Sequence, residues 1–126
     1  MARKGIIYEE LSKEDKIKLA IAELTEPFMS VDEATMKVVR PLLQNAGFMK
    51  VTLEELQSAI NEKGVLEKYQ NGENQWGTKK SPEVEIYLTM SKNFAQIIKQ
   101  MFEMIPDAEK TEAGEALMSF LKQNAK

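Results

Sequence analysis

The sequence of residues 81–106 is SPEVEIYLTMSKNFAQIIKQMFEMIP. Ser81 and Pro82 suit the cap and the first turn of a helix, and the next proline along the chain is Pro106. A helix over residues 82–105 would be about 36 Å long at 1.5 Å per residue. The stretch therefore predicts one long helix as the main element of a mainly α-helical fold.

This predicted helix is apolar around more than half of its circumference. Written as heptads from Val84, positions a, d, e and g are nearly all apolar. A surface helix with one packing partner needs an apolar stripe of only about 100° or somewhat more. The other segments are too small to cover such a rod on several sides, so we expect it to form the interface of a homo-oligomer. The expected interface residues are Val84, Tyr87, Leu88, Phe94, Ile98, Met101, Phe102 and Ile105.

Two shorter helices are predicted upstream from their apolar spacing. The first spans about residues 13–26. The second spans about residues 31–46, from a capping box that starts at Ser30 to a left-handed stop at Gly47. Pro41 lies inside the second segment and removes a backbone hydrogen bond, so we expect a bend or a division there.

A third short helix and a hairpin or loop follow. Thr52 and Glu55 form a second capping box, which predicts a helix over residues 53–63. The helical period disappears over residues 65–78, where Asn71-Gly72 is the dipeptide that best suits a two-residue hairpin turn. This segment is therefore expected to be a small hairpin or an irregular loop.

The predicted elements divide the chain into three regions. Residues 1–64 form an N-terminal helical region, and residues 65–81 form a hairpin or loop connector. Residues 82–126 hold the long helix and a C-terminal helix, which starts after Pro106. A length of 126 residues is about that of one domain, so two large domains are excluded.

The residue types that are missing limit the possible chemistry. The chain contains neither cysteine nor histidine, so disulfides, the usual zinc sites and Ser-His or Cys-His catalysis cannot be built from it. It also lacks a Gly-rich phosphate loop ending in Lys-Ser or Lys-Thr. We therefore expect a protein that is not an enzyme and has no cofactor and no bound metal.

Charge and hydropathy indicate a globular protein that contacts any nucleic acid locally. Lysine and arginine number 17 against 20 acidic residues, a net charge of −3, so a surface that is basic all over is excluded. No apolar run approaches the roughly 20 residues that a membrane-spanning helix needs. The chain turns acidic at Glu9 before any sustained apolar segment, which argues against a secretory signal. The expected compartment is the cytosol, with no membrane partner.

Two groups of basic residues are candidates for DNA contacts. Lys79 and Lys80 lie close to Trp76 in the sequence, and lysine with tryptophan can bind a DNA backbone and stack on a base. Lys37 and Arg40 share the polar face of the second predicted helix and could contact phosphates. The alternatives are a solvated lysine pair beside a core tryptophan, and an exposed ion pair on the helix surface.

A winged helix-turn-helix is a further possibility, because three helices precede the predicted hairpin. The helix over residues 53–63 would then enter the major groove. It opens with Glu54 and Glu55, which phosphates repel, so we expect it to be a core helix instead.

A longer stretch carries a family resemblance. Residues 69–87 are YQNGENQWGTKKSPEVEIY, followed by NFAQIIKQM at residues 93–101 and by Ile105-Pro106. An Asn-Gly loop thus leads through a Lys-Lys step and a proline into a long helix. This order resembles the core of the small terminase subunits of tailed bacteriophages, whose long helix oligomerises. The resemblance covers about residues 45–106.

The resemblance implies a homo-oligomer, such as a ring, that binds the packaging-start region of double-stranded phage DNA. It further implies that the oligomer regulates a separate large terminase subunit with ATPase and nuclease activity, in the cytosol of a host cell. The alternative is a helical protein-protein adaptor of phage or bacterial origin that does not bind DNA. Tight, salt-dependent binding to a packaging site separates the two functions.

Overall fold

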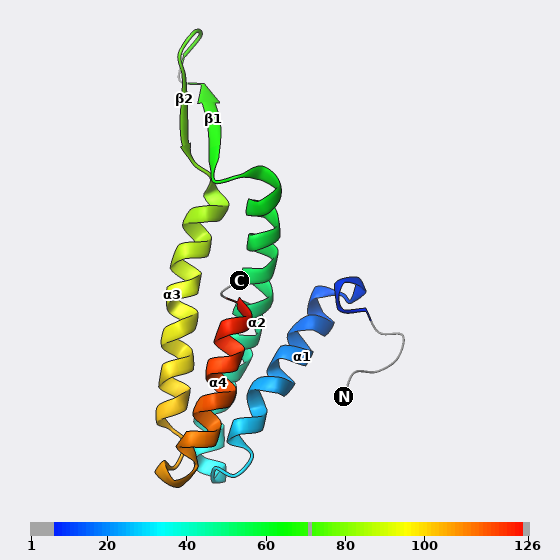
Figure 1. The fold of residues 1–126 in the computed structure, drawn as a ribbon, viewed down its shortest axis with the longest axis vertical. Coiled ribbons are helices and arrows are strands. Elements are labelled where there is room, and N and C mark those ends of the chain that lie inside the picture. The colour runs from blue at the N-terminus through cyan, green and yellow to red at the C-terminus, as the bar shows by residue number, and fades with distance from the viewer. Residues whose placement is uncertain (1–6, 71, 125–126) are drawn as a thin grey trace.

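The computed structural model describes residues 7–70 and 72–124 of the chain, and in these residues the fold is mainly α-helical with one small antiparallel sheet. The α-helices are α1 (Lys13–Thr25), α2 (Glu33–Lys63), α3 (Pro82–Glu103) and α4 (Lys110–Asn124). The strands are β1 (Leu66–Gln70) and β2 (Trp76–Lys80). Short 3-10 turns are η1 (Tyr8–Glu10), η2 (Glu26–Phe28) and η3 (Asp107–Glu109). The two strands form a hairpin that projects beyond the helices (Figure 1).

Helix α2 replaces two of the predicted helices, so the expected stop at Gly47 is wrong. Gly47 is buried inside the helix, where a Cβ atom would lie 2.5 Å from Ile21 Cγ1 and 3.3 Å from the Ile17 carbonyl oxygen. The missing side chain therefore lets α1 approach α2 closely. Pro41 also lies inside α2 without dividing it. Its lost hydrogen bond, which costs about 3 kcal/mol, is offset by the apolar burial along this helix.

The first turn of α2 is capped by a residue other than the one predicted. Asp32 Oδ1 accepts the backbone N–H of Thr35 at 2.7 Å, and this hydrogen bond lowers the pKa of the Asp32 carboxyl. Ser30 instead donates its hydroxyl to Glu109 of η3. The capping box expected at Ser30 is therefore wrong, and that side chain links the segment before α2 to η3, just before the start of α4.

The second predicted capping box is also wrong, because Thr52 lies in the middle of α2. Both glutamates that follow it bind the N-terminal segment. Glu54 accepts the Tyr8 hydroxyl at 2.5 Å, and Glu55 lies 2.9 Å from Lys13 Nζ. The acidic pair predicted to open a helix thus connects α2 to η1 and α1.

Helix α3 starts where the sequence predicts it and ends slightly earlier, at Glu103. Ser81 occupies the cap position, but its hydroxyl donates to the Gly64 carbonyl at 3.4 Å and not to α3. Its backbone N–H donates to the Val65 carbonyl at 2.9 Å. Gly64, at φ +89°, ends α2 as expected. The end of α2 and the start of α3 are therefore joined directly beneath the hairpin.

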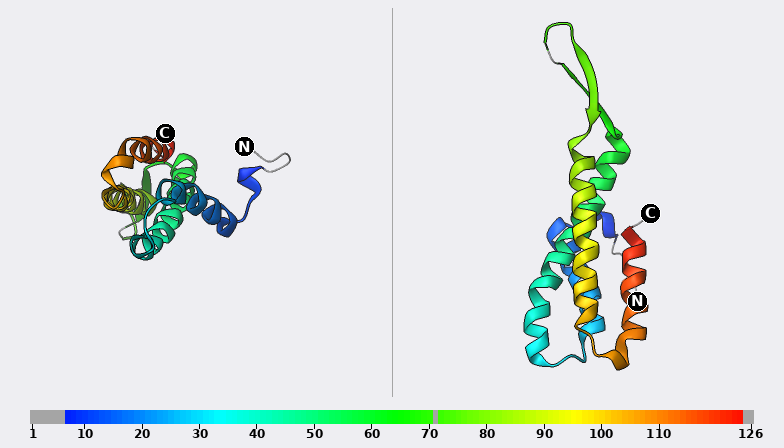
Figure 2. Two further views of the ribbon diagram at one scale, coloured as in Figure 1. Left: turned by 90° about the horizontal axis from the view of Figure 1, so that it is seen from below. Right: turned by 90° about the vertical axis from the view of Figure 1, so that its left-hand side faces the viewer.

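One hydrophobic core spans the first and third predicted regions. It contains side chains from α1, α2, α3 and α4, and α2 and α3 lie side by side along the molecule (Figures 1 and 2). Four of the expected interface residues, Phe94, Ile98, Met101 and Ile105, are buried in this core. The premise that the rest of the chain cannot cover α3 is therefore wrong for its C-terminal half.

The N-terminal half of α3 is covered less completely. Val84 and Tyr87 are half-buried, and the Tyr87 hydroxyl accepts a hydrogen bond from Gln57 Nε2 at 2.9 Å. Leu88 is 55% exposed, and Phe102, farther along α3, is half-buried. Of the expected interface residues, only this partly open set could contact another subunit without unfolding the core. Among the described residues, no helix combines the length and the apolar character required to cross a membrane.

Candidate nucleic-acid interface

The hairpin exposes two different faces because its strands alternate side chains. Its register pairs Leu66 with Lys80, Lys68 with Thr78, and Gln70 with Trp76. Paired residues share a face and their neighbours along the strand point to the opposite one. One face, called here the lysine–tryptophan face, consists of Leu66, Lys68, Gln70, Trp76, Thr78 and Lys80. The other, the tyrosine face, consists of Glu67, Tyr69, Gly77 and Lys79.

The lysine–tryptophan face carries two positive charges and no strand carboxylate. Trp76 is 66% exposed at the first residue of β2. Lys68 and Lys80 are exposed, and Lys80 Nζ lies 3.6 Å from Glu85 Oε1 at the start of α3. An exposed ion pair at that separation contributes little to the stability of the fold, so a phosphate can replace the Glu85 carboxylate as the partner of Lys80.

The tyrosine face is occupied by its own contacts. The Tyr69 ring covers Gly77, where a Cβ atom would lie 2.9 Å from Tyr69 Cζ. Lys79 Nζ lies 5.8 Å from the centre of the Tyr69 ring and 3.8 Å from Glu67 Oε2. This face has no net charge, and its aromatic ring stabilises the hairpin itself.

The register separates the two lysines that were predicted to act together. Lys79 and Lys80 point to opposite faces, so Trp76 shares its face with Lys80 and not with Lys79. It also shares that face with Lys68, which no pattern in the sequence singles out. Only the strand register could have identified Lys68, because it comes from the other strand.

The strands are joined by a longer connection than the predicted two-residue turn. Residues 71–75 lie between them. Gly72 has φ +111°, as a turn glycine should, whereas Asn71 lies outside the described residues. Gln70 Nε2 donates to the Glu73 carbonyl at 2.8 Å and closes the connection from one side.

The base of the hairpin is held by an ion pair between the two long helices. Lys63 Nζ, at the end of α2, donates to Glu83 Oε2, in the first turn of α3, at 2.9 Å. This hydrogen bond raises the pKa of Lys63 and lowers the pKa of Glu83. Together with the Ser81 contacts, it fixes both ends of the hairpin to the helical body.

The second pair of predicted DNA contacts lies at the other end of the molecule. Lys37 and Arg40 are exposed in the first turns of α2, far from the hairpin (Figure 1). The helical rise from Lys37 to Lys63 alone is roughly 39 Å. These residues cannot belong to one compact site with the hairpin of the same chain.

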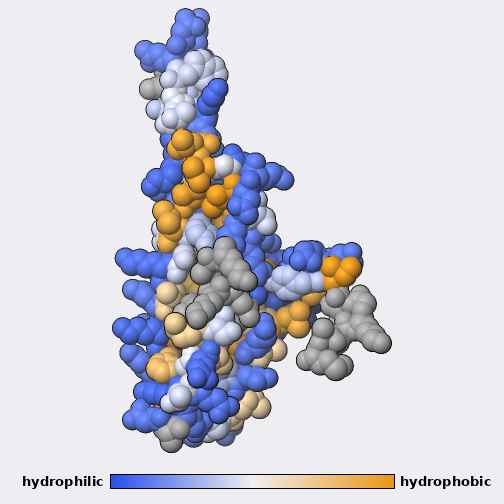
Figure 3. Space-filling view, in the orientation of Figure 1, coloured by the Kyte–Doolittle hydropathy of each residue, from blue (hydrophilic) through white to orange (hydrophobic). Residues whose placement is uncertain are grey.

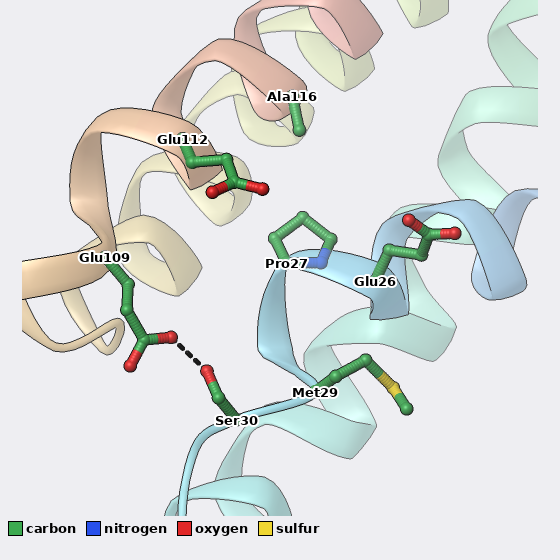
Figure 4. Close-up of a pocket in the computed structure, with 7 residues that line it drawn as sticks. All are labelled: Glu26, Pro27, Met29, Ser30, Glu109, Glu112 and Ala116. Atoms are coloured by element: carbon green, nitrogen blue, oxygen red, sulfur yellow. Dashed lines mark hydrogen bonds between the residues drawn. The ribbon is translucent and has the colours of Figure 1, made fainter.

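An acidic pocket of about 330 Å³ lies between η2 and the start of α4 (Figure 4). Glu26, Glu109 and Glu112 line it, and Glu109 accepts the Ser30 hydroxyl. Its charge repels phosphate, so it is not part of a nucleic-acid surface. In the described part of the chain, no three acidic side chains are close enough to form a metal site.

A mixed polar cluster connects η1 to α2. The buried Lys50 places its Nζ 2.8 Å from Glu54 Oε2, and Glu54 also accepts the Tyr8 hydroxyl. Burial, with the hydrogen bond to Glu54 as a further cause, raises the pKa of Tyr8. The charges are satisfied within the cluster, which indicates a structural role in holding the N-terminal segment on α2.

Hydrophobic side chains gather directly below the hairpin (Figure 3). Val65, Leu66 and Leu88 are more than half exposed near this junction and are named the neck patch, whereas the half-exposed Ile86 lies on the opposite side of α3 from Leu88. Exposed apolar residues on adjoining elements indicate a surface for another protein chain.

The geometry therefore offers a basic, aromatic hairpin face and an apolar neck beneath it. Comparisons of the chain with protein-family models, with curated proteins and with solved structures gave no significant match.

Proposed function

We propose that this chain is the small subunit of a phage terminase, a self-associating protein that binds double-stranded viral DNA and presents it to a separate ATPase-nuclease subunit. The observation that carries the proposal is the lysine–tryptophan face, on an arm that extends beyond the helical body. The order of loop, lysine pair, proline and long helix in residues 69–106, which resembles that family, supports it.

The DNA contact is local and repeated. A chain of net charge −3 with two lysines on one hairpin face neutralises few phosphates, so a single copy binds weakly. Several copies in one assembly present the same face several times and gain affinity by avidity. The function therefore depends on self-association.

Self-association uses the open half of α3. The neck patch supplies exposed apolar surface, and Val84 with Tyr87 extends it along the helix. This arrangement uses only Leu66 at the base of the hairpin and leaves the rest of the hairpin free at one end of every subunit. The large subunit then binds elsewhere on the assembly and provides the nucleotide hydrolysis that this chain lacks the residues to perform.

Two charge-matched double variants test the DNA contact. Lys68→Gln with Lys80→Gln removes two positive charges from the hairpin, and Lys37→Gln with Arg40→Gln removes two from the far end of α2. Each phosphate contact adds about −0.9 to the slope of log affinity against log salt. The hairpin variant should therefore flatten the slope by about 1.8 for each bound chain.

The assay is fluorescence anisotropy of a labelled DNA duplex at several salt concentrations. The α2 variant should match the wild type. If that variant loses affinity and the hairpin variant does not, the contact lies at the other end of the molecule. If the wild type binds no DNA but forms a stable complex with a protein partner through the neck patch, the protein is the alternative adaptor.

A further inference from the structure

Trp76 lies outside the hydrophobic core formed by the described residues. It is the only tryptophan of the chain and is 66% exposed, on a hairpin that contributes no residue to the hydrophobic core formed by the described residues. A large aromatic side chain left in water gives up the burial that usually accounts for its presence. Its surroundings on the lysine–tryptophan face therefore indicate what it binds.

The other aromatic residue of the hairpin is a useful contrast. Tyr69 covers Gly77 and lies near Lys79, and Glu67 neutralises that lysine. The hairpin thus already has an aromatic residue that stabilises its backbone. Trp76 is on the opposite face, beside Gln70 and away from those contacts.

Two lysines extend from Trp76 in a row on the same face. Lys68 is opposite Thr78, so it is a diagonal neighbour of both Trp76 and Lys80. Diagonal neighbours of an antiparallel pair are about 7–8 Å apart. An exposed ring followed by two cations at this spacing fits a polyanion with flat, apolar groups between its charges, which is the chemistry of a nucleic-acid strand.

We infer that Trp76 stacks on an unpaired base, so that the hairpin holds DNA where it is single-stranded or locally opened. The inference rests on the proposed function and specifies the DNA substrate of the same face. In an intact duplex the neighbouring base pairs cover the faces of each base, and only the edges and the backbone are accessible. An unpaired strand exposes base faces to the ring and phosphates to Lys68 and Lys80.

The sole tryptophan provides a direct measurement. The wild-type protein is titrated with a mixed-sequence single strand and with the matching duplex, while Trp76 fluorescence and binding are both recorded. We expect the single strand to quench the emission and to bind more tightly than the duplex. Stacking of one base corresponds to a factor of about 5 to 150 in affinity, so Trp76→Ala should lose that factor on the single strand.

Three variants separate stacking from charge. Trp76→Ala should change duplex binding less than threefold, and Trp76→Phe should restore part of the single-strand affinity. Lys68→Gln with Lys80→Gln should weaken both substrates. We therefore expect the Trp76 ring to affect the affinity for the single strand only, and the two lysines to affect the affinity for both substrates.

The outcomes distinguish this inference from the proposed function. If the duplex binds as tightly as the single strand without quenching, the inference is wrong and the proposed function stands. If neither substrate binds, both are wrong. If acrylamide fails to quench Trp76 fluorescence in the protein without DNA, another chain covers the ring in the assembly and the inference is also wrong.

Discussion

Ile98 and Leu88 lie on the same helix and provide a matched pair that separates folding from association. The sequence placed both in a subunit interface, whereas the structure buries Ile98 to 3% exposure and leaves Leu88 55% exposed. Changing each to alanine removes a similar amount of apolar side chain. The two variants should therefore fail in different ways.

The expected magnitudes follow from these environments. Replacing a buried isoleucine with alanine costs about 2–5 kcal/mol. The open pocket between α3 and α4, which Ile98 and Phe102 help to line, leaves part of the Ile98 environment unfilled, so we expect about 2–4 kcal/mol. That loss is a large share of the roughly 5–15 kcal/mol that stabilises a domain of ordinary size. Leu88→Ala should change the folding free energy by about 0.5 kcal/mol.

Urea unfolding followed by circular dichroism, repeated at several protein concentrations, measures both effects. Ile98→Ala should lower the midpoint at every concentration with an unchanged slope. Leu88→Ala should alter only the concentration dependence of the midpoint, because it weakens association and not the core. If Ile98→Ala keeps the wild-type midpoint under dissociating conditions, Ile98 is an interface residue and the intramolecular core described above is wrong.

Three further changes test the local physics. The hydrogen-bonded Asp32 carboxyl has a pKa below its usual 3.8, so it stabilises the protein above that pH and loses this effect as the pH falls further. The difference in unfolding free energy between wild type and Asp32→Asn should therefore shrink in acid. A difference that does not depend on pH would contradict the cap. Because the pKa of Tyr8 is raised, its contribution to the unfolding free energy is present below pH 10.0 and declines at higher pH. Tyr8→Phe should abolish the late step of a tyrosinate titration and cost about 1 kcal/mol through the lost hydrogen bond to Glu54. An unchanged titration would place that step on another tyrosine. Gly47→Val should destabilise the protein by about 1–3 kcal/mol in urea unfolding because the valine side chain meets Ile21. Gly47→Ala should cost less because alanine favours a helix over glycine by about 1 kcal/mol. A stabilised valine variant would show that α1 and α2 can separate at no cost.

Several features of this protein are determined by the sequence alone, because they depend on local stereochemistry. Pro82 fixes the start of α3, and Gly64 ends α2 at a positive φ that other residues avoid. The loss of helical period after residue 64 predicts a small hairpin or an irregular loop, and the structure has a hairpin there. The mainly α-helical fold follows from these boundaries and from apolar spacing.

Other features depend on contacts between distant segments. Gly47 has the same local signal whether it ends a helix or lets a second helix approach, and only the packing of Ile17 and Ile21 against it decides between these roles. Which segments cover α3 also depends on contacts between distant parts of the chain. Its apolar columns predict that something covers them, but the extended α2 and the returning α4 determine that the cover is intramolecular for half of the helix.

The candidate binding face depends on register. A two-residue turn at Asn71-Gly72 would pair Lys68 with Gln75, which would place Lys68 on the same face as Lys79. The observed pairing of Lys68 with Thr78 places it with Trp76 and Lys80 instead. Because side chains alternate along a strand, an odd shift in register exchanges the two faces. The sequence therefore supplied the lysines and the tryptophan, and only the tertiary structure decided which of them can act together.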